Sequence, residues 1–189
     1  MKYTKYFFIF LFLSALYGDN TIFITKQIIF YPSIFLKYNL PLLKPGDILI
    51  KKKEPKMLEW FGHCGVVTQN YTVAEFPKIG AGFKNNPISN WYNEGRYVAV
   101  LRLSFLSPVF LNNIYQNINS AKSKPYGFSH KKSNSFYYCS QFIWKIFNIK
   151  TEDSKVINLD SDSGITVWPY DILFSDELFQ VKLNKYNRK

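Results

Sequence analysis

The chain has 189 residues, of which 47% are hydrophobic, 19% aromatic and 20% charged, and its formal net charge is +11. This composition excludes intrinsic disorder and fits one domain with a sizeable core. The two cysteines, Cys64 and Cys139, and the two histidines, His63 and His130, are too few and too poorly spaced for a zinc finger or a disulfide-stapled miniprotein. The lysines form short, scattered groups without an arginine-rich stripe, so we do not expect a nucleic-acid partner.

The first residues have the organisation of a secretory signal. Lys2 and Lys5 precede an uncharged, mostly apolar stretch over residues 6–18, which is too short to span a bilayer comfortably. We therefore expect residues 1–18 to be a signal peptide, or a retained membrane anchor because no clean cleavage site follows. The expected location is outside the cytoplasm: periplasmic, envelope-associated or secreted. The basic charge would draw such a protein to anionic envelope polymers or an anionic membrane surface.

A second apolar segment, residues 19–43, follows the signal. Lys26, Pro32 and Lys37 interrupt it, which argues against a membrane span. The pattern favours an N-terminal arm that packs on the domain, and a position on a membrane surface is the alternative. Residues 44–189 are then expected to form a single domain, because no linker divides them.

The first half of this domain is rich in β-strand signals. Strands are predicted over four short β-prone runs: 48–50, 62–68, 72–76 and 96–103. The second and third runs predict a hairpin around residues 69–71. The lysine cluster at 51–53 is expected in an exposed loop, and residues 77–90 carry the glycine, asparagine and proline signals of a loop.

Helical patterns occupy the second half. Pro108 opens a stretch with helix-like apolar spacing that ends near residue 124. Residues 139–147 have the pattern of a buried helix whose first turn contains Cys139. Order is expected to resume at 167–173. The sum predicts an α+β fold with an antiparallel sheet and helices packed on one side.

Cys139 and His63 are the residues in which catalytic chemistry is expected. A helix N-terminus lowers the pKa of a cysteine thiol, and a nearby histidine lowers it further and returns the proton to a leaving group. His63 lies on a strand between Gly62 and Gly65, small neighbours that leave room for a substrate. Taken singly, a cysteine in an apolar helix is more often a buried hydrophobe, and a strand histidine is more often structural.

Glu75 is the candidate for the group that orients the histidine. If the hairpin loop is residues 68–70, His63 and Glu75 lie opposite each other on the same face of the sheet. A two-residue turn would instead place Phe76 opposite His63, although diagonal reach would still permit contact with Glu75.

The order of these motifs resembles the YiiX/YebB-like branch of the permuted NlpC-type, papain-like cysteine hydrolases. The resemblance covers roughly residues 44–175. It is carried by five short motifs in sequence: Pro45-Gly46-Asp47-Ile48-Leu49, Gly62-His63-x-Gly65-Val66-Val67, Val73-x-Glu75, Tyr138-Cys139-Ser140-x-Phe142-x-Trp144 and Gly164-Ile165-x-Val167-x-Pro169-x-Asp171-Ile172. In ordinary papain-like enzymes the cysteine precedes the histidine, and the permutation accounts for the reversed order here.

The resemblance implies a circularly permuted papain-like (NlpC-type) fold and three site residues. Cys139 would be the nucleophile, His63 the general base and acid, and Glu75 the polar third member. In the related lecithin:retinol acyltransferase-like proteins a second histidine stands at the place of Glu75. Many family members have a Tyr-Asp pair where this chain has Tyr126-Gly127, so substrate contacts there are expected to differ.

The implied reaction is attack of the Cys139 thiolate on an amide or ester carbonyl, followed by release of the acyl group to water or another acceptor. The backbone N–H of Cys139 is the natural oxyanion donor, because it points out of the helix start. Tyr138 and Ser140 are candidates for the second donor. No cofactor and no metal are required by this chemistry.

Several other residues are of types that often occur in functional sites, but we expect them to have structural roles here. Cys64 is expected to pack in the core, facing away from His63, and a disulfide with the nucleophile is the alternative. His130 is expected at the surface. Asp160-x-Asp162-x-Gly164 is similar to the start of a calcium loop, but its glycine is one place early, so no metal site is expected.

These observations favour an exported cysteine amidase or peptidase that acts on a cell-envelope peptide. A lipid acyltransferase or deacylase on the same scaffold is the first alternative, because the apolar arm and basic groups would suit a lipid substrate. A non-catalytic envelope-binding protein that keeps the fold is the second. The sequence carries no indication of the oligomeric state.

Overall fold

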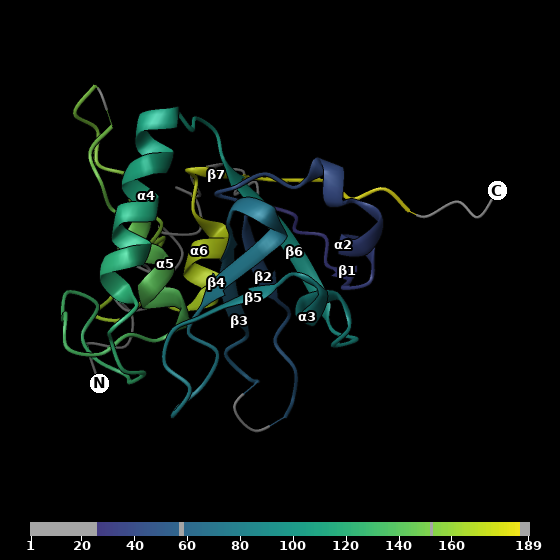
Figure 1. Ribbon diagram of the computed structural model, residues 1–189, viewed down its shortest axis with the longest axis horizontal. Helices are drawn as coiled ribbons and strands as arrows, with labels where there is room; N and C mark the ends of the chain where they lie inside the picture. The colour runs from purple at the N-terminus through teal and green to yellow at the C-terminus, as the bar shows by residue number, and fades with distance from the viewer. Residues whose placement is uncertain (1–25, 57–58, 152, 186–189) are drawn as a thin grey trace, which may run out of the picture.

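A seven-stranded antiparallel sheet forms the centre of the computed structural model, which describes residues 26–56, 59–151 and 153–185 (Figure 1). The strands are β1 (Tyr31–Pro32), β2 (Ile48–Lys51), β3 (His63–Val67), β4 (Thr72–Glu75), β5 (Lys84–Pro87), β6 (Tyr97–Leu103) and β7 (Leu178–Gln180). Their order in the sheet is β1-β6-β2-β3-β4-β5, and β7 also pairs with β6. The predicted antiparallel α+β fold is confirmed.

Five α-helices and two 3-10 turns complete the described part of the chain. They are α2 (Phe35–Tyr38), α3 (Ser89–Tyr92), α4 (Pro108–Ala121), α5 (Cys139–Phe147), α6 (Pro169–Phe174), η1 (Leu40–Leu42) and η2 (Gln69–Tyr71). The two long predicted helices are therefore present as α4 and α5. The signal predicted for residues 1–18 lies outside the described residues.

The sheet has a hydrophobic core on each face, because successive strand side chains point to opposite sides. Ile48 and Ile50 join the core beneath α4, α5 and α6, whereas Leu49 joins the core on the other face with Leu36 of α2 and Trp91 of α3. Figure 1 shows α4 and α5 on one side of the sheet and the short helices α2 and α3 on the other. Helices thus cover both faces, not the single face expected.

Helix α5 forms because its apolar residues recur at helical spacing and no glycine or proline interrupts it. Tyr138, the residue before it, has an extended backbone, and its carbonyl accepts the first helical hydrogen bond from Phe142 N–H at 2.9 Å. Eight of its nine residues are buried. The helix packs against β3, α4 and α6, so the sheet and two helices fix its first residue, Cys139.

The described part of the apolar arm lies against the domain. Tyr31 and Pro32 pair with β6, and the Leu36 side chain is fully buried. Burying a leucine in this way contributes about 1.5–3 kcal/mol to folding. Lys26 Nζ donates to the carbonyls of Ser175 and Leu178 at 2.7 Å each. Within the described ranges, no helix has the length and apolar character needed to cross a bilayer.

Two regions differ from the sequence-based expectation. The segment predicted as a loop, 77–90, contains β5 and the start of α3, and β7 was not predicted. Strand β5 has the sequence Lys-Asn-Asn-Pro and lies at the sheet edge, where exposed polar side chains leave no hydrophobic alternation.

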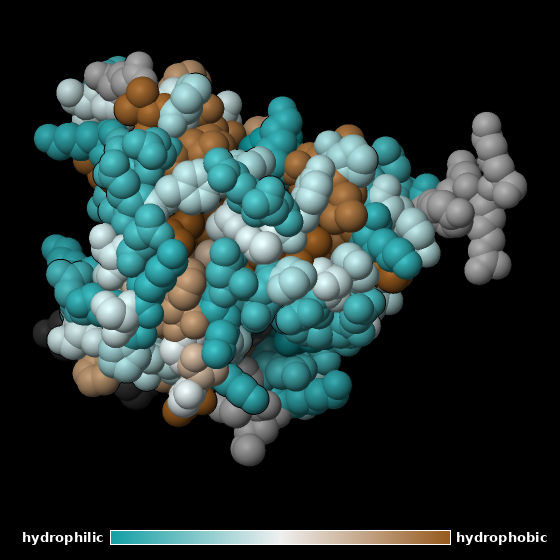
Figure 2. Space-filling view, in the orientation of Figure 1, coloured by the Kyte–Doolittle hydropathy of each residue, from teal (hydrophilic) through white to brown (hydrophobic). Residues whose placement is uncertain are grey.

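On the face shown in Figure 2, hydrophilic residues predominate and hydrophobic residues are visible mainly between them.

Candidate active site

The hairpin of β3 and β4 brings His63 and Glu75 to one face of the sheet. Val66 lies opposite Ala74 and Val67 opposite Val73, so the predicted register, with residue 63 opposite residue 75, is wrong by two positions. The loop is residues 69–71, one position later than expected, because the Thr68 N–H bonds the Thr72 carbonyl at 2.8 Å. A shift of two keeps both side chains on the same face and makes them diagonal neighbours.

His63 and Glu75 are nevertheless in direct contact. His63 Nε2 lies 2.7 Å from Glu75 Oε2, and the two side chains are 12% and 6% exposed. Asn86 of the neighbouring strand donates from Nδ2 to the other Glu75 oxygen at 3.4 Å. Because Glu75 occupies Nε2, Nδ1 is the ring nitrogen left to face Cys139.

Trp91 and Lys51 support the back of the imidazole. The Trp91 ring stacks on His63 with centroids 5.5 Å apart, and Lys51 Nζ lies 4.2 Å from the Trp91 ring centroid. Lys51 stands opposite His63 in the β2–β3 register and forms an ion pair with Glu94. The ring has room only because residue 65 is glycine. A Cβ there would lie 3.0 Å from Trp91 Cζ2 and 2.6 Å from the side chain of Val73.

The position and burial of Lys51 differ from the sequence-based prediction. It was expected in an exposed loop with its neighbours, but it is the last residue of β2 and is only 6% exposed. Trp91 was not identified because it lies in α3, which begins at the end of the segment predicted as a loop and was not predicted. The signal that could have found both is Gly65, since a glycine inside a strand marks the close approach of another group.

Cys139 is the first residue of α5, as predicted, and its side chain faces the start of β3. Its sulfur interacts with the His63 ring and with the thiol and backbone N–H of Cys64. Both cysteines are free thiols. Cys64 is fully buried in the core, as expected, yet it does not stand apart from the site, because its thiol contacts that of Cys139.

The surroundings of Cys139 favour its thiolate. Its contact with the Cys64 thiol and then with the His63 ring holds the pKa of Cys139 well below the ordinary thiol value, against the opposing effect of burial. The helix start acts in the same direction. Burial raises the pKa of Cys64, and its contact with Cys139 raises it further, so Cys64 stays protonated.

His63 and Glu75 are poised as a charged pair. Burial lowers the pKa of His63, but contacts with Cys139 and Glu75 outweigh burial and raise it above its ordinary value. Burial raises the pKa of Glu75, and the His63 contact and charge outweigh that effect and lower it. The arrangement can hold a thiolate, an imidazolium and a carboxylate in a row, which is the charge state that nucleophilic catalysis by cysteine requires.

Tyr138 and Ser140, on either side of Cys139, bond to one residue of the loop before α6. The Tyr138 hydroxyl accepts from Val167 N–H at 3.1 Å, and the Ser140 hydroxyl donates to the Val167 carbonyl at 2.7 Å. Both side chains are buried. They hold the start of α5 against this loop, whereas the Cys139 N–H lies in the first turn, where amides have no partner within the helix.

Aromatic side chains surround this helix start. Phe61 and Phe128, each about half exposed, flank the Trp168 ring with centroid distances of 4.7 and 6.4 Å, and we call these three residues the aromatic rim. Phe128 also stacks on Tyr138 at 5.2 Å. Burial and the nearby Cys139 charge raise the pKa of Tyr126, so its hydroxyl remains a hydrogen-bond donor.

The remaining candidate residues lie outside this site. His130 is exposed in the loop before α5, and its Nδ1 accepts from Lys132 N–H at 3.1 Å. Among the described residues, one group of acidic, histidine or cysteine side chains is close enough to hold a metal ion: Asp160, Asp162 and Asp171. That group includes none of the residues around Cys139.

Comparisons with known proteins agree with the fold described above. The crystal structure of the metalloprotein YiiX from Escherichia coli O157:H7 has a similar fold, with a TM-score of 0.55 and 18% sequence identity over 75% of this chain and 97% of that one. A search of curated proteins found no significant match. The profile described as permuted papain-like amidase enzyme, YaeF/YiiX, C92 family, matches residues 42–180. That span contains the whole of β2 to β7, and the chain belongs to this family of permuted papain-like amidases.

Proposed function

We propose that the protein is an exported cysteine amidase or peptidase that cleaves an amide bond in a cell-envelope substrate. Family membership supports the cysteine hydrolase class. The observation that carries the assignment of residues is the row formed by Cys139, His63 and Glu75, with the cysteine at a helix start. The basic composition and the signal-like first 18 residues support export.

The reaction begins at the Cys139 sulfur. The thiolate attacks the amide carbonyl carbon, and the carbonyl oxygen becomes an oxyanion near the Cys139 N–H. His63 then gives its proton to the departing amine as the carbon–nitrogen bond breaks, which leaves a thioester on Cys139. His63 next takes a proton from water, and the resulting hydroxide attacks the thioester. The carboxylic product leaves, and the thiolate and imidazolium are restored.

Glu75 orients His63 in this scheme without touching the reacting atoms. Glu75→Gln is expected to lower kcat/KM by about 10²-fold, because the amide can still bond Nε2 but removes the charge that stabilises the imidazolium. The carboxylate helps to raise the pKa of His63, so its loss moves the alkaline limb of the kcat/KM profile to lower pH.

The measurement for this variant is a pH–rate profile on purified protein. Glu177→Gln is the matched control, since its carboxylate pairs with Lys155 away from His63. A Glu75→Gln enzyme with the wild-type profile and less than threefold lower turnover would remove Glu75 from the mechanism.

A lipid substrate is the second candidate, and the aromatic rim favours it. Exposed Phe61 and Phe128 beside the start of α5 give an apolar surface next to the nucleophile, and such residues insert into lipid interfaces. Lys53 is exposed with its Nζ 4.1 Å from the ring of Tyr170 in α6, and it would meet anionic headgroups. On this alternative the same thiolate would accept an acyl group from an ester and pass it to water or an amine.

Two substrate panels separate these functions. Wild-type protein is incubated with murein peptides in one panel and with phospholipid vesicles in the other, and the products are identified by mass spectrometry. We expect new amine and carboxyl ends in the murein panel. Release of fatty acid or transfer of an acyl chain would instead establish the lipid function. Products that persist with Cys139→Ala would point to a contaminant.

A further inference from the structure

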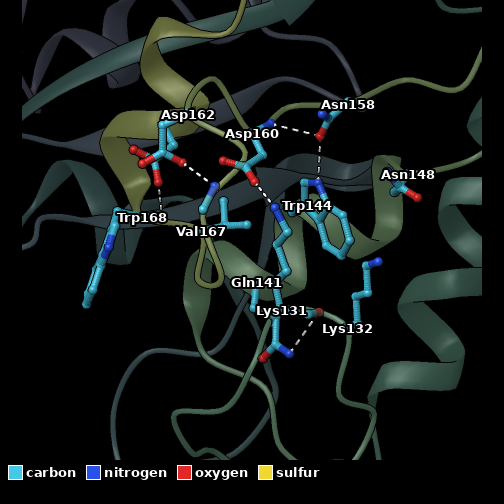
Figure 3. A network of polar contacts seen from close by, with 12 residues as sticks. Lys131, Lys132, Gln141, Trp144, Asn148, Asn158, Asp160, Asp162, Val167 and Trp168 are labelled. Carbon is cyan, nitrogen blue, oxygen red and sulfur yellow. Dashed lines mark hydrogen bonds and ion pairs between the residues drawn. The ribbon is translucent and has the colours of Figure 1, made fainter.

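Three carboxylates converge away from Cys139, where the loop after α5 meets α6. They belong to Asp160, Asp162 and Asp171, and one ligand oxygen of each lies within 4.8 Å of the other two. Figure 3 shows Asp160 and Asp162 side by side, with Lys131, from the segment before α5, reaching the Asp160 carboxylate from below. The proposed catalytic residues take no part in this cluster.

Hydrogen bonds hold two of the carboxylates by one oxygen each. Asp162 Oδ1 accepts from Gly164 N–H at 2.8 Å, and Asp171 Oδ2 accepts from Trp168 N–H at 2.6 Å. Gly164 lets this carboxylate approach the backbone closely, since a Cβ at residue 164 would lie 3.1 Å from Asp162 Oδ1. These bonds set the orientation of each carboxylate and leave its second oxygen outside them, as is usual for ligands that are fixed by an outer shell of hydrogen bonds.

Asp160 provides an independent indication of a ligand site. Its side chain is 0% exposed, and Lys131 pairs with Oδ2 alone. Oδ1 is buried and has no hydrogen-bond partner among the described residues. In Figure 3 this oxygen lies on the side of Asp160 that faces Asp162. A buried carboxylate oxygen without a partner is costly, so its presence calls for an ion or another group that satisfies it.

The charges in the cluster favour a cation. Three carboxylates face one contacting ammonium, that of Lys131, and Lys53 is a further cation that acts on Asp171. Negative charge is in excess even when both lysines are counted. All the donors are oxygens, which suit the hard cations Ca²⁺, Mg²⁺ and Mn²⁺ better than the metals that prefer histidine or cysteine.

We propose that Asp160, Asp162 and Asp171 together bind one hard divalent cation, with Ca²⁺ as the best fit. Asp162 is exposed and Asp171 partly exposed, so water can complete the coordination from the open side. Ca²⁺ tolerates such an uneven set of ligands, whereas Mg²⁺ demands a near-ideal octahedron. The third carboxylate comes from α6, whereas a calcium-loop motif would take it from the loop itself.

A cation here would fix the loop that borders the proposed active site. The loop runs from Asp160 to α6 and includes Val167, which bonds to both neighbours of Cys139, and Trp168 of the aromatic rim. Bound Ca²⁺ would therefore tie α6 and this loop together next to the start of α5. The expected consequence is a higher unfolding midpoint with Ca²⁺, since a ligand that binds only the folded state stabilises it.

Terbium luminescence on the full chain tests the site. After treatment with EDTA and its removal, Tb³⁺ is added and tryptophan is excited, because Trp168 lies beside Asp171 and can sensitise the ion. We expect saturation at one ion per chain, displacement by Ca²⁺, and a higher unfolding midpoint with Ca²⁺. Asp162→Asn is expected to weaken binding by about tenfold or more.

Asp162 is the position of choice because it is exposed, so the variant should fold even if Asp160→Asn does not. Asp153→Asn is the matched control, since Asp153 is an exposed aspartate that bonds Thr151 outside the cluster. Cys139→Ala should bind Tb³⁺ as the wild type does, which keeps this test separate from the amidase proposal. Absence of saturable binding at millimolar Ca²⁺ or Tb³⁺, or equal binding by folded Asp162→Asn, would overturn the proposal.

Discussion

Cys139→Ala is expected to lower amide turnover by about 10⁴-fold or more, because the other thiol near His63, that of Cys64, is fully buried and stays protonated. The substitution removes one sulfur from a side chain that is 9% exposed, and alanine is a good helix former, so α5 should remain intact. The measurement is kcat/KM on the amide substrate, with the thermal unfolding midpoint as the check on folding.

Cys139→Ser gives the matched comparison. Serine keeps the shape of the side chain, but its hydroxyl does not ionise near neutral pH, so the geometry alone would not restore turnover. We expect both variants to be inactive and folded. If Cys139→Ala keeps activity within tenfold of the wild type, Cys139 is not the nucleophile. If no substrate panel shows turnover even for the wild type, the alternative of a non-catalytic envelope-binding protein is favoured.

His63→Ala is expected to have the second largest effect, a loss of about 10³-fold or more in kcat/KM. The histidine acts twice in the proposed reaction, since it stabilises the thiolate and protonates the departing amine. Removal of the ring also takes away the His63 contact and charge that lower the pKa of the Cys139 thiol, so that pKa rises. Turnover near neutral pH should therefore fall for both reasons.

His130→Ala is the control for this variant, because His130 is the other histidine and is exposed outside the site. It should retain wild-type turnover. His63→Gln offers a second test, since glutamine fills similar space without an ionisable ring. Turnover by His63→Ala within tenfold of the wild type would show that another group acts as the acid and base.

Elements with strong local patterns could be predicted from the sequence. The apolar spacing of α5 and the proline that opens α4 depend only on residues within each helix. The strands β2, β3, β4 and β6 are short runs of β-prone residues between turn signals. Because Cys139 begins α5 and His63 begins β3, these patterns were sufficient to identify the pair as a candidate.

The elements that were missed depend on contacts that a local pattern does not contain. Strand β5 is polar because it is exposed at the sheet edge, and β7 is a three-residue strand that forms by pairing with β6. The hairpin register depends on where η2 places its turn, and Asn70 and Tyr71 both adopt positive φ there. Lys51 is buried only because Trp91 and Glu94, distant in sequence, accept its ammonium group.

The central claim is that Cys139 is a thiolate stabilised by His63, and the pH dependence of its alkylation tests that claim most directly. Native protein is treated with iodoacetamide from acidic to alkaline pH, and the modified cysteine is identified by mass spectrometry. We expect Cys139 to react at pH values well below the ordinary thiol pKa of about 8.5, and Cys64 to stay unmodified while the fold is intact. An alkylation midpoint for Cys139 at that ordinary value, or reaction no faster than that of Cys64, would contradict the account.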